Sequence, residues 1–425
     1  MRASETWIIK ETMRHLFLVL LLMTPLLGLR ADDGDTIKTA DAAHYAVSIS
    51  ANESYLIPKG SHNQRVMHSY GVTYIDARFQ WRPGGYNAYD RAYNRPTLEA
   101  GLLYGDFSHV KIQDPDAPAP SHVGHEWALF AGMQYDIWRK RRWRAGVNLQ
   151  NGVAWFSRRY DENNNADNQL VGSPLSVFID LGAYLSYRLS SRWEVSAGWD
   201  FKHVSNGTLE RPNLGANTIG ATVRVAYNIT DDPIEPKGYK DPYKDRSGLR
   251  LPERPVYLEF SAGLGANTLT DQFNYHHSNS NTLYVSPFVM LAPMWRYSRI
   301  MASGVEMDYI YANYPGHIRK YDELNERYGY KYSHNVLGLG LRHEFFYRHL
   351  SLHMGIGWYV YRKMGYSASN SEGNSYQTIG FRYSLPCTQD RLFIGYQVKA
   401  HNFSKADCMQ MSIGYRLPIL KIKGC

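Results

Sequence analysis

Cysteine is scarce in this sequence of 425 residues, and its scarcity excludes two classes of protein. The three cysteines are Cys387, Cys408 and Cys425. Their spacing is not that of metal ligands, and an odd number does not make a disulfide framework, so neither a zinc site nor a disulfide scaffold is expected. We expect no disulfide between Cys387 and Cys408, and a free thiol at Cys425.

Long apolar runs are also missing beyond the first thirty residues. The run from Leu16 to Leu29 contains Pro25 and is shorter than the roughly 20 residues of a membrane-spanning helix. With Leu29-Arg30-Ala31 as a cleavage site, it is typical of an export signal, so residues 1–31 are expected to be removed. No cysteine follows for a lipid anchor. The mature chain is therefore an exported soluble protein or a β-barrel, because it has no helix that could hold it in a membrane.

Clustered charge is the third missing feature. The formal net charge of +8 would suit an anionic partner, but Lys and Arg are scattered along the chain, so no nucleic-acid surface is expected. Aromatic residues, by contrast, are abundant, with 34 Tyr and 10 Trp. These side chains accumulate where hydrocarbon meets water at a membrane surface.

Alternation of apolar and polar residues indicates strands throughout. Between residues 193 and 201 every odd position is apolar, and every even position is polar or Gly. The same pattern recurs in 175–189, 217–227 and 409–417. These strands are longer than those of most soluble sheets and match tilted membrane crossings of about 9–11 residues plus overhang. Long polar connections also alternate with tight turns, as in outer-membrane barrels.

The predicted fold is all-β, an antiparallel transmembrane outer-membrane β-barrel of about sixteen strands in two halves of eight. The first half occupies residues 32–230, a proline-rich periplasmic linker occupies 231–254, and the second half occupies 255–425. One barrel of sixteen strands and two tandem barrels of eight both fit this pattern. The end of the chain after Leu417 is expected to be a short periplasmic tail.

One segment breaks the alternation at the end of the strand beginning at Trp193. His203 and Ser205 are two residues apart, so they share the apolar, lipid-facing side of that strand with Phe201. A hairpin joins this strand to the next, whose lipid-facing set begins at Asn217. The three side chains should therefore meet at one rim of the outer wall, where unpaired polar groups would be costly.

These are the parts of a serine ester hydrolase. A Ser205 hydroxyl needs a base within hydrogen-bond reach, and His203 can be that base. Asn217 can accept a hydrogen bond from the ring and fix its tautomer. Asn206, Asn213 and the amide of Gly207 are candidates for holding an oxyanion.

The stretch His203-Val204-Ser205-Asn206-Gly207, followed by Pro212-Asn213-x-Gly215-x-Asn217, resembles the lipid A 3-O-deacylase family of outer-membrane barrels, also called acyloxyacyl hydrolases. The resemblance extends over roughly residues 40 to 230. It implies that His203 is the base, Ser205 the nucleophile and Asn213 an oxyanion contributor. It also implies a site on the lipid-facing wall.

The chain departs from that family at its third member, where Asn217 stands in place of the usual Glu. Glu210 lies in the intervening loop and is a weaker alternative for this role. Outer-membrane phospholipase A is similar here, with His-x-Ser-Asn-Gly and an Asn in the third role. The resemblance to phospholipase A would imply a requirement for Ca²⁺ and for dimers, whereas the resemblance to the lipid A deacylase family implies no cofactor.

The expected function is therefore an outer-membrane esterase that cleaves an acyl ester of lipid A, with phospholipase A activity as the alternative. The third hypothesis is not an enzyme: it is a non-catalytic barrel that serves as a pore, scaffold or adhesin. The second half is expected to carry no site, because His401 falls on the inward face of its strand and lacks a serine two residues away.

Overall fold

The computed structural model describes residues 43–85, 87–117, 119–234, 249–251, 253–278, 281–402 and 405–423. The expected export segment 1–31, residues 235–248 of the expected linker, and Cys425 lie outside the described residues. Cys387 and Cys408 are free thiols, as expected.

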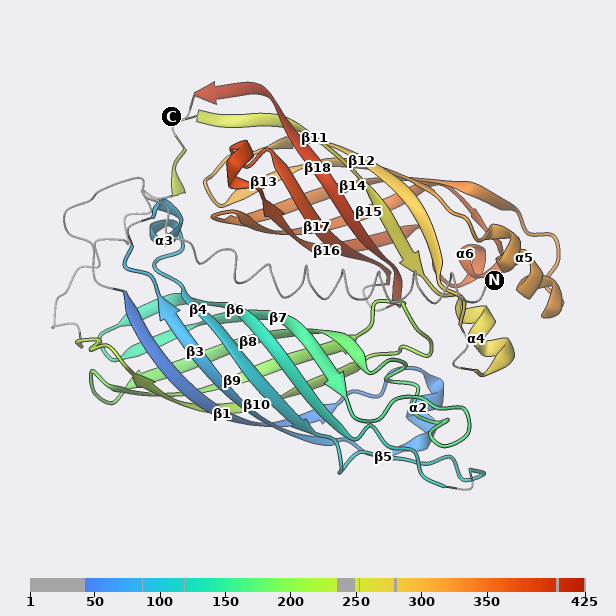
Figure 1. Ribbon diagram of the computed structural model, residues 1–425, viewed down its shortest axis with the longest axis horizontal. Coiled ribbons are helices and arrows are strands. Elements are labelled where there is room, and N and C mark those ends of the chain that lie inside the picture. Colours follow the sequence, from blue (N-terminus) through green and yellow to red (C-terminus); the bar gives the residue numbers. More distant parts are fainter. Residues whose placement is uncertain are drawn as a thin grey trace. The chain divides into compact units, whose positions relative to one another are not determined.

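Eight antiparallel strands form a first closed barrel in the order β1-β10-β9-β8-β7-β6-β4-β3 (Figure 1). The first and last strands of the set pair with each other, so the barrel has no free edge. Its strands are β1 (His44–Leu56), β3 (Gly71–Arg82), β4 (Thr97–Asp106), β6 (His125–Lys140), β7 (Trp143–Phe156), β8 (Leu175–Arg188), β9 (Trp193–Ser205) and β10 (Ala216–Asn228).

Eight further strands close a second barrel in simple chain order, from β11 to β18. The structure thus has two barrels of eight strands and not one of sixteen. The strands of the second barrel are β11 (Glu253–Asn267), β12 (Tyr284–Trp295), β13 (Met301–Tyr311), β14 (Tyr332–Tyr347), β15 (Leu350–Met364), β16 (Ser375–Ser384), β17 (Leu392–His401) and β18 (Lys405–Lys423).

The last strand corrects the expectation of a tail after Leu417. β18 continues to Lys423, where it pairs with Glu253 at the start of β11. β11 in turn begins two residues before the expected boundary at 255. The backbone groups of β11 need partners along their whole length, and the residues after Leu417 supply them. Local alternation of apolar and polar residues could not predict this pairing, because it joins the first and last strands of the barrel.

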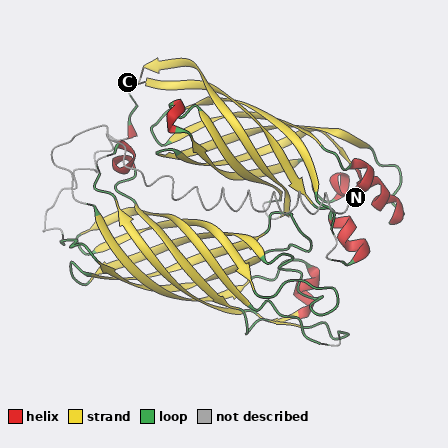
Figure 2. Cartoon of the chain, in the orientation of Figure 1, coloured by secondary structure: helices red, strands yellow, loops and turns green. Residues whose placement is uncertain are grey.

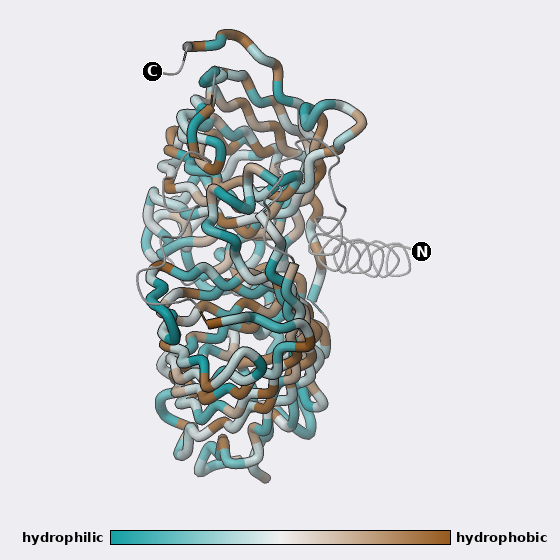
Figure 3. The backbone as a smooth tube through the Cα atoms, turned by 90° about the vertical axis from the view of Figure 1, so that its left-hand side faces the viewer, coloured by the Kyte–Doolittle hydropathy of each residue, from teal (hydrophilic) through white to brown (hydrophobic). Residues whose placement is uncertain are grey.

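Alternation along the strands sorts side chains into an apolar outer wall and a polar interior, and hydrophobic and hydrophilic residues alternate along the backbone tube in Figure 3. Trp199 is 66% exposed and Leu341 62%, as expected of residues on the lipid-facing wall of a barrel. Inside the first barrel, Glu99 accepts hydrogen bonds from Arg78 at 3.0 Å and from Gln134 at 2.9 Å.

The interior of the second barrel is built on a similar polar core. Glu259 accepts hydrogen bonds from Arg342 at 2.5 Å, Arg382 at 2.6 Å and Arg416 at 3.2 Å. Such charge-assisted bonds satisfy ions that would otherwise be costly to bury. Interlocked side chains therefore occupy the middle of each barrel.

Short helices lie in the connections between strands and not within the barrel walls (Figure 2). They are α2 (Ser61–Val66), α3 (Ala88–Ala92), α4 (Thr270–His276), α5 (Pro315–Leu324), α6 (Gly365–Asn370) and the 3-10 turn η2 (Pro386–Thr388). Two short strands, β2 (Met67–Ser69) and β5 (Lys111–Ile112), pair with each other in the loops of the first barrel. Among the described helices, none has the length and apolar character needed to cross a bilayer.

A hydrophobic cluster fills one end of the first barrel beneath its longer loops. Its members include Leu56, Phe107, Phe156 and Phe178, all with 1% or less of their surface exposed. Val204 belongs to the same cluster and brings the end of β9 into contact with it. This end of the barrel is therefore tightly packed, which matters for the side chains on its outer surface.

Candidate active site

The hairpin of β9 and β10 brings together the three side chains that the sequence predicted to meet. Asn217 is the direct cross-strand partner of His203, and Ser205 follows His203 by two residues on the same face. All three are half-buried, whereas Phe201 and Ile219 further along the same face are exposed. The three polar groups therefore lie at one rim of the apolar outer wall.

Hydrogen bonds connect the three side chains in a line. Nδ1 of His203 lies 2.6 Å from Oδ1 of Asn217, and Nε2 lies 3.0 Å from Oγ of Ser205. An amide oxygen can only accept a hydrogen bond, so the Nδ1–H of His203 donates to it. Nε2 is then left without a proton and can accept the hydroxyl proton of Ser205.

The residue between His203 and Ser205 fixes their backbone. Val204 points inward and is 3% exposed, and its cross-strand partner Ala216 is 1% exposed. Both belong to the hydrophobic cluster under the loops. Because this packing holds β9 and β10 on the inner side, the polar groups on the outer side are held in a fixed geometry.

Gly215 approaches the site closely from the loop between the two strands. Its φ of +77° lies in the left-handed region. A Cβ at this position would lie 3.1 Å from the carbonyl oxygen of Val204 and 3.3 Å from Cε1 of His203. A glycine is thus needed both for the backbone conformation and for the space beside the imidazole.

The loop after Ser205 is tied down by two asparagines. The backbone N–H of Asn206 donates to Oδ1 of Asn213 at 3.2 Å, and Nδ2 of Asn206 donates to Oγ of Ser173 at 3.1 Å. Asn206 is buried and takes part in both bonds, while Asn213 accepts through its side-chain oxygen, so this bond does not use its NH₂. Gly207, the third expected contributor, follows with a φ of +60°.

Neither of the two hydrogen bonds described for the His203 ring goes to Glu210. Both ring nitrogens of His203 already have partners, Asn217 on one side and Ser205 on the other. Asn217 thus occupies the position that the third member of a triad would take.

Sequence reasoning missed a segment that borders the site from β1. The N–H of Ile57 donates to the carbonyl oxygen of Asn217 at 2.8 Å, one step beyond the last pair of the β1–β10 ladder. Barrel closure was the signal that could have revealed it. When the first and last strands of a barrel pair, the end of the first lies beside the start of the last.

The second barrel contains a Ser–His contact that the sequence did not suggest. Ser303 and His343 are cross-strand partners, and Oγ of Ser303 lies 2.8 Å from Nδ1 of His343. In the described part of the chain, no third side chain is bonded to His343. This contact lacks the arrangement of three groups that the first barrel has.

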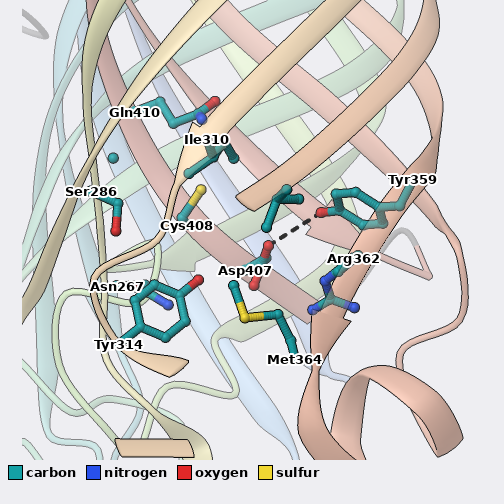
Figure 4. Close-up of a pocket in the computed structure, with 12 residues that line it drawn as sticks. Asn267, Ser286, Ile310, Tyr314, Tyr359, Arg362, Met364, Asp407, Cys408 and Gln410 are labelled. Carbon is teal, nitrogen blue, oxygen red and sulfur yellow. Dashed lines mark hydrogen bonds between the residues drawn. The ribbon is translucent and has the colours of Figure 1, made fainter. Parts of the chain in front are cut away.

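A pocket in the second barrel also lacks a nucleophile paired with a base (Figure 4). Tyr359 donates to Asp407 at its wall, at 3.4 Å. The hydroxyl of Ser286, also in the lining, contacts Asn313 and not a histidine. Within the ranges that the structure describes, no group of three His, Cys, Asp or Glu side chains could hold a metal ion.

The fold and the site define an outer-membrane β-barrel with a serine, histidine and asparagine aligned on its outer wall. Residues 73–226 match the family described as lipid A 3-O-deacylase (PagL), and residues 256–419 match the family described as acyloxyacyl hydrolase, C-terminal domain. The chain belongs to this lipid A 3-O-deacylase and acyloxyacyl hydrolase family, whose members are ester hydrolases. Membership implies deacylation of lipid A.

Two solved structures are weakly similar to this chain. Neisserial surface protein A is 11% identical, with 44% of this chain and 99% of that chain covered and a TM-score of 0.26. The outer-membrane protein Omp33 of Acinetobacter baumannii is 7% identical, with 88% and 99% covered and a TM-score of 0.15. No curated protein matches the chain.

Proposed function

We propose that the protein removes an ester-linked acyl chain from lipid A by a serine-hydrolase mechanism, with Ser205 as nucleophile, His203 as general base and Asn217 as the residue that orients the base. The observation that carries this proposal is the pair of hydrogen bonds that His203 makes, one to Ser205 and one to Asn217.

In the first step, Nε2 of His203 takes the hydroxyl proton while Oγ of Ser205 attacks the ester carbonyl carbon. The tetrahedral intermediate collapses, the sugar oxygen leaves with the proton from Nε2, and the acyl group stays on Ser205. A water molecule then gives a proton to His203 and attacks the acyl-serine. Collapse of this second intermediate releases the fatty acid and restores the serine hydroxyl.

The negative oxygen of each intermediate needs hydrogen-bond donors. Asn213 supplies the side-chain NH₂ that its bond to Asn206 leaves available, and the backbone N–H of Gly207 is a second donor. Asn206 itself acts as a positioning residue, because its N–H and its side chain hold Asn213 and Ser173.

The loops support placement of the site at the outer leaflet, where lipid A resides. All four connections at the end of the first barrel that carries the site are long, spanning 57–70, 107–124, 157–174 and 206–215. At the other end, 141–142 and 189–192 are tight turns, whereas the third connection, 83–96, is longer and contains α3. Outer-membrane barrels place long loops outside and short turns in the periplasm. On the lipid-facing wall, the acyl chain can stay in the bilayer while its ester reaches Ser205.

A fluorophosphonate probe tests the nucleophile directly, since it reacts with a serine that a neighbouring base activates. We expect the folded protein in detergent to be labelled at Ser205, as located by peptide mass spectrometry. Labelling should be lost in Ser205→Ala and strongly slowed in His203→Ala. Ser196→Ala, on the opposite face of the same strand, is the matched control and should be labelled like the wild type. Equal labelling of the wild type and Ser205→Ala would contradict the proposal.

Phospholipase A activity is the second candidate, and Asn217 is the observation that favours it. An asparagine in the third role is the feature by which this site is similar to outer-membrane phospholipase A. The two activities differ in product. A lipid A deacylase releases a hydroxyacyl chain from lipopolysaccharide, whereas a phospholipase releases fatty acid from phosphatidylethanolamine.

A further inference from the structure

Strand register, extended past the last pairs of β1–β10 and β9–β10, places Lys59 in the same transverse row of the barrel wall as Ser205. The β1–β10 ladder, in which Leu56 pairs with Thr218, is extended by the hydrogen bond from Ile57 to Asn217. Two residues further on, the same register places Lys59 beside Gly215. Across the hairpin, the β9–β10 register that pairs Val204 with Ala216 places Ser205 beside Gly215 from the other side.

A second contact agrees with this register past the last strand pair. Gly60 should then face Leu214, and a Cβ on Gly60 would indeed lie 3.3 Å from Cδ1 of Leu214. The segment from Ile57 to Gly60 therefore runs alongside residues 214–217. Lys59 is also near enough for its charge to act on the His203 ring.

The central residue of the row has no side chain. Gly215 places no side chain between Ser205 and Lys59, and the space beside it is filled by His203 and Ser205; the backbones of Ser205 and Lys59 are two strand spacings apart, about 10 Å. Below this row the outer face is apolar, with Tyr55, Ile57, Phe201 and Ile219 exposed. A lysine at such a boundary keeps its stem on the apolar wall and extends its ammonium toward the polar side.

Resting on the proposed function, we infer that Lys59 is a specificity-determining residue that binds a phosphate on the sugar headgroup of lipid A while the ester lies over Ser205. Acyl chains would cover the apolar wall, the ester would reach the row of Ser205, and the headgroup would lie above it. An ammonium at that level pairs with a phosphate as a point charge. It contributes binding energy to the substrate and takes no part in proton transfer.

Kinetics with two forms of one substrate test this inference. The full-length protein would be assayed in mixed micelles with bisphosphorylated lipid A and with lipid A from which both phosphates have been removed. Lys59→Met keeps the stem and loses the charge, and Lys59→Arg keeps the charge. Lys111→Met, which removes an exposed lysine from another loop of the same barrel, is the matched control.

We expect Lys59→Met to raise KM for bisphosphorylated lipid A about five-fold, the change that one interfacial lysine typically makes, with kcat unaltered. The rise should shrink in high salt, because screening weakens the attraction. On dephosphorylated lipid A, Lys59→Met and the wild type should have the same KM. Lys59→Arg and Lys111→Met should match the wild type on both substrates.

Two outcomes would overturn the inference while leaving the proposed function intact. One is Ser205-dependent deacylation with the same KM in Lys59→Met and the wild type on the phosphorylated substrate. The other is an equal loss on both substrates, which would place Lys59 at the reacting ester and not at a phosphate. Turnover that persists in Ser205→Ala would instead refute the proposed function itself.

Discussion

Asn217 faces His203 directly across the β9–β10 pair, with its Oδ1 2.6 Å from Nδ1 of the ring. The contact fixes the tautomer of the histidine with a neutral acceptor and not a carboxylate. A neutral group orients the imidazole but stabilises the imidazolium less than a negative charge would. It also avoids an ionised side chain on a wall that faces lipid, where charge is costly.

Removing the nucleophile or the base should abolish most deacylation. Ser205→Ala and His203→Ala are each expected to lower kcat by on the order of 10⁴ to 10⁶, and the double variant should be no worse than either alone. Initial rates of fatty-acid release measure this. Losses that multiply in the double variant would show that the two residues do not act as a unit.

Replacing the orienting residue should be less damaging. Asn217→Ala is expected to retain about 10² more activity than Ser205→Ala, as orienting residues of serine hydrolases do. Asn217→Asp keeps the acceptor and adds charge, so its turnover at neutral pH should equal or exceed that of the wild type. Ile219→Ala, the next outward position on β10, is the control. An inactive Asn217→Asp would contradict a purely orienting role.

The proposed role of Asn213 as an oxyanion donor can be tested separately from the hydrogen bond that it accepts from the Asn206 N–H. Asn213→Asp keeps an oxygen that accepts from the Asn206 N–H, but it has no NH₂ to offer an oxyanion. Its kcat is expected to fall by about 10² to 10³ with KM little changed, the usual cost of losing one oxyanion donor. Wild-type kcat in this variant would remove Asn213 from the proposed oxyanion site.

Gly215 should tolerate no side chain. Gly215→Ala puts a Cβ into a left-handed backbone at 3.3 Å from the His203 ring. We expect a loss of roughly 1–2 kcal/mol in the free energy of unfolding, together with reduced turnover as the imidazole is displaced. Gly71→Ala is the matched control, because nothing lies within 4 Å of its Cβ position. Urea unfolding in detergent and initial rates compare the two variants, and equal behaviour would refute the close approach.

Acid should weaken the first barrel through Asp232, which lies just beyond β10. Burial raises the pKa of this carboxyl, but Arg82, Arg144 and Arg188 lower it more, so its pKa in the folded state is well below the ordinary value. The ion pairs are 2.9 Å long to Arg82 and 2.7 Å to Arg144. With a folded pKa below the unfolded one, Asp232 stabilises the barrel above about pH 4, and this contribution is lost as the pH falls further.

Asp232→Asn should therefore cost about 3–5 kcal/mol in the free energy of unfolding at pH 7, and the difference from the wild type should shrink toward pH 3. Asp231→Asn, whose exposed carboxylate lies 3.5 Å from Arg192, should change little. Urea midpoints at the two pH values provide the comparison. A difference independent of pH would mean that the carboxylate charge is not what stabilises the barrel.

Local alternation predicted most of the wall, because a strand with one lipid-facing side must alternate. The strand predicted from Trp193 to Ser205 has those bounds in β9, and the segment predicted at 175–189 is β8, one residue shorter. The same alternation of odd and even positions predicted that the side chains of His203, Ser205 and Asn217 lie on the outer side of the wall. The end of β18 was missed because its pairing with β11 joins residues far apart in the sequence.

Other features depend on three-dimensional packing that no local pattern encodes. The positive φ of Gly215 and the bond between Asn206 and Ser173 arise from how the loops settle over the hydrophobic cluster. Barrel closure, which brings Ile57 beside Asn217, could have been anticipated once the number of strands in each barrel was known.

The most direct test of the account is the product of the reaction. The detergent-folded protein and its Ser205→Ala variant would be incubated with lipid A and, separately, with phosphatidylethanolamine, and the products identified by mass spectrometry. The account predicts that lipid A loses one hydroxyacyl chain only when Ser205 is present, and that the phospholipid stays intact. Ser205-dependent release of fatty acid from phosphatidylethanolamine alone, or no Ser205-dependent product from either lipid, would contradict it.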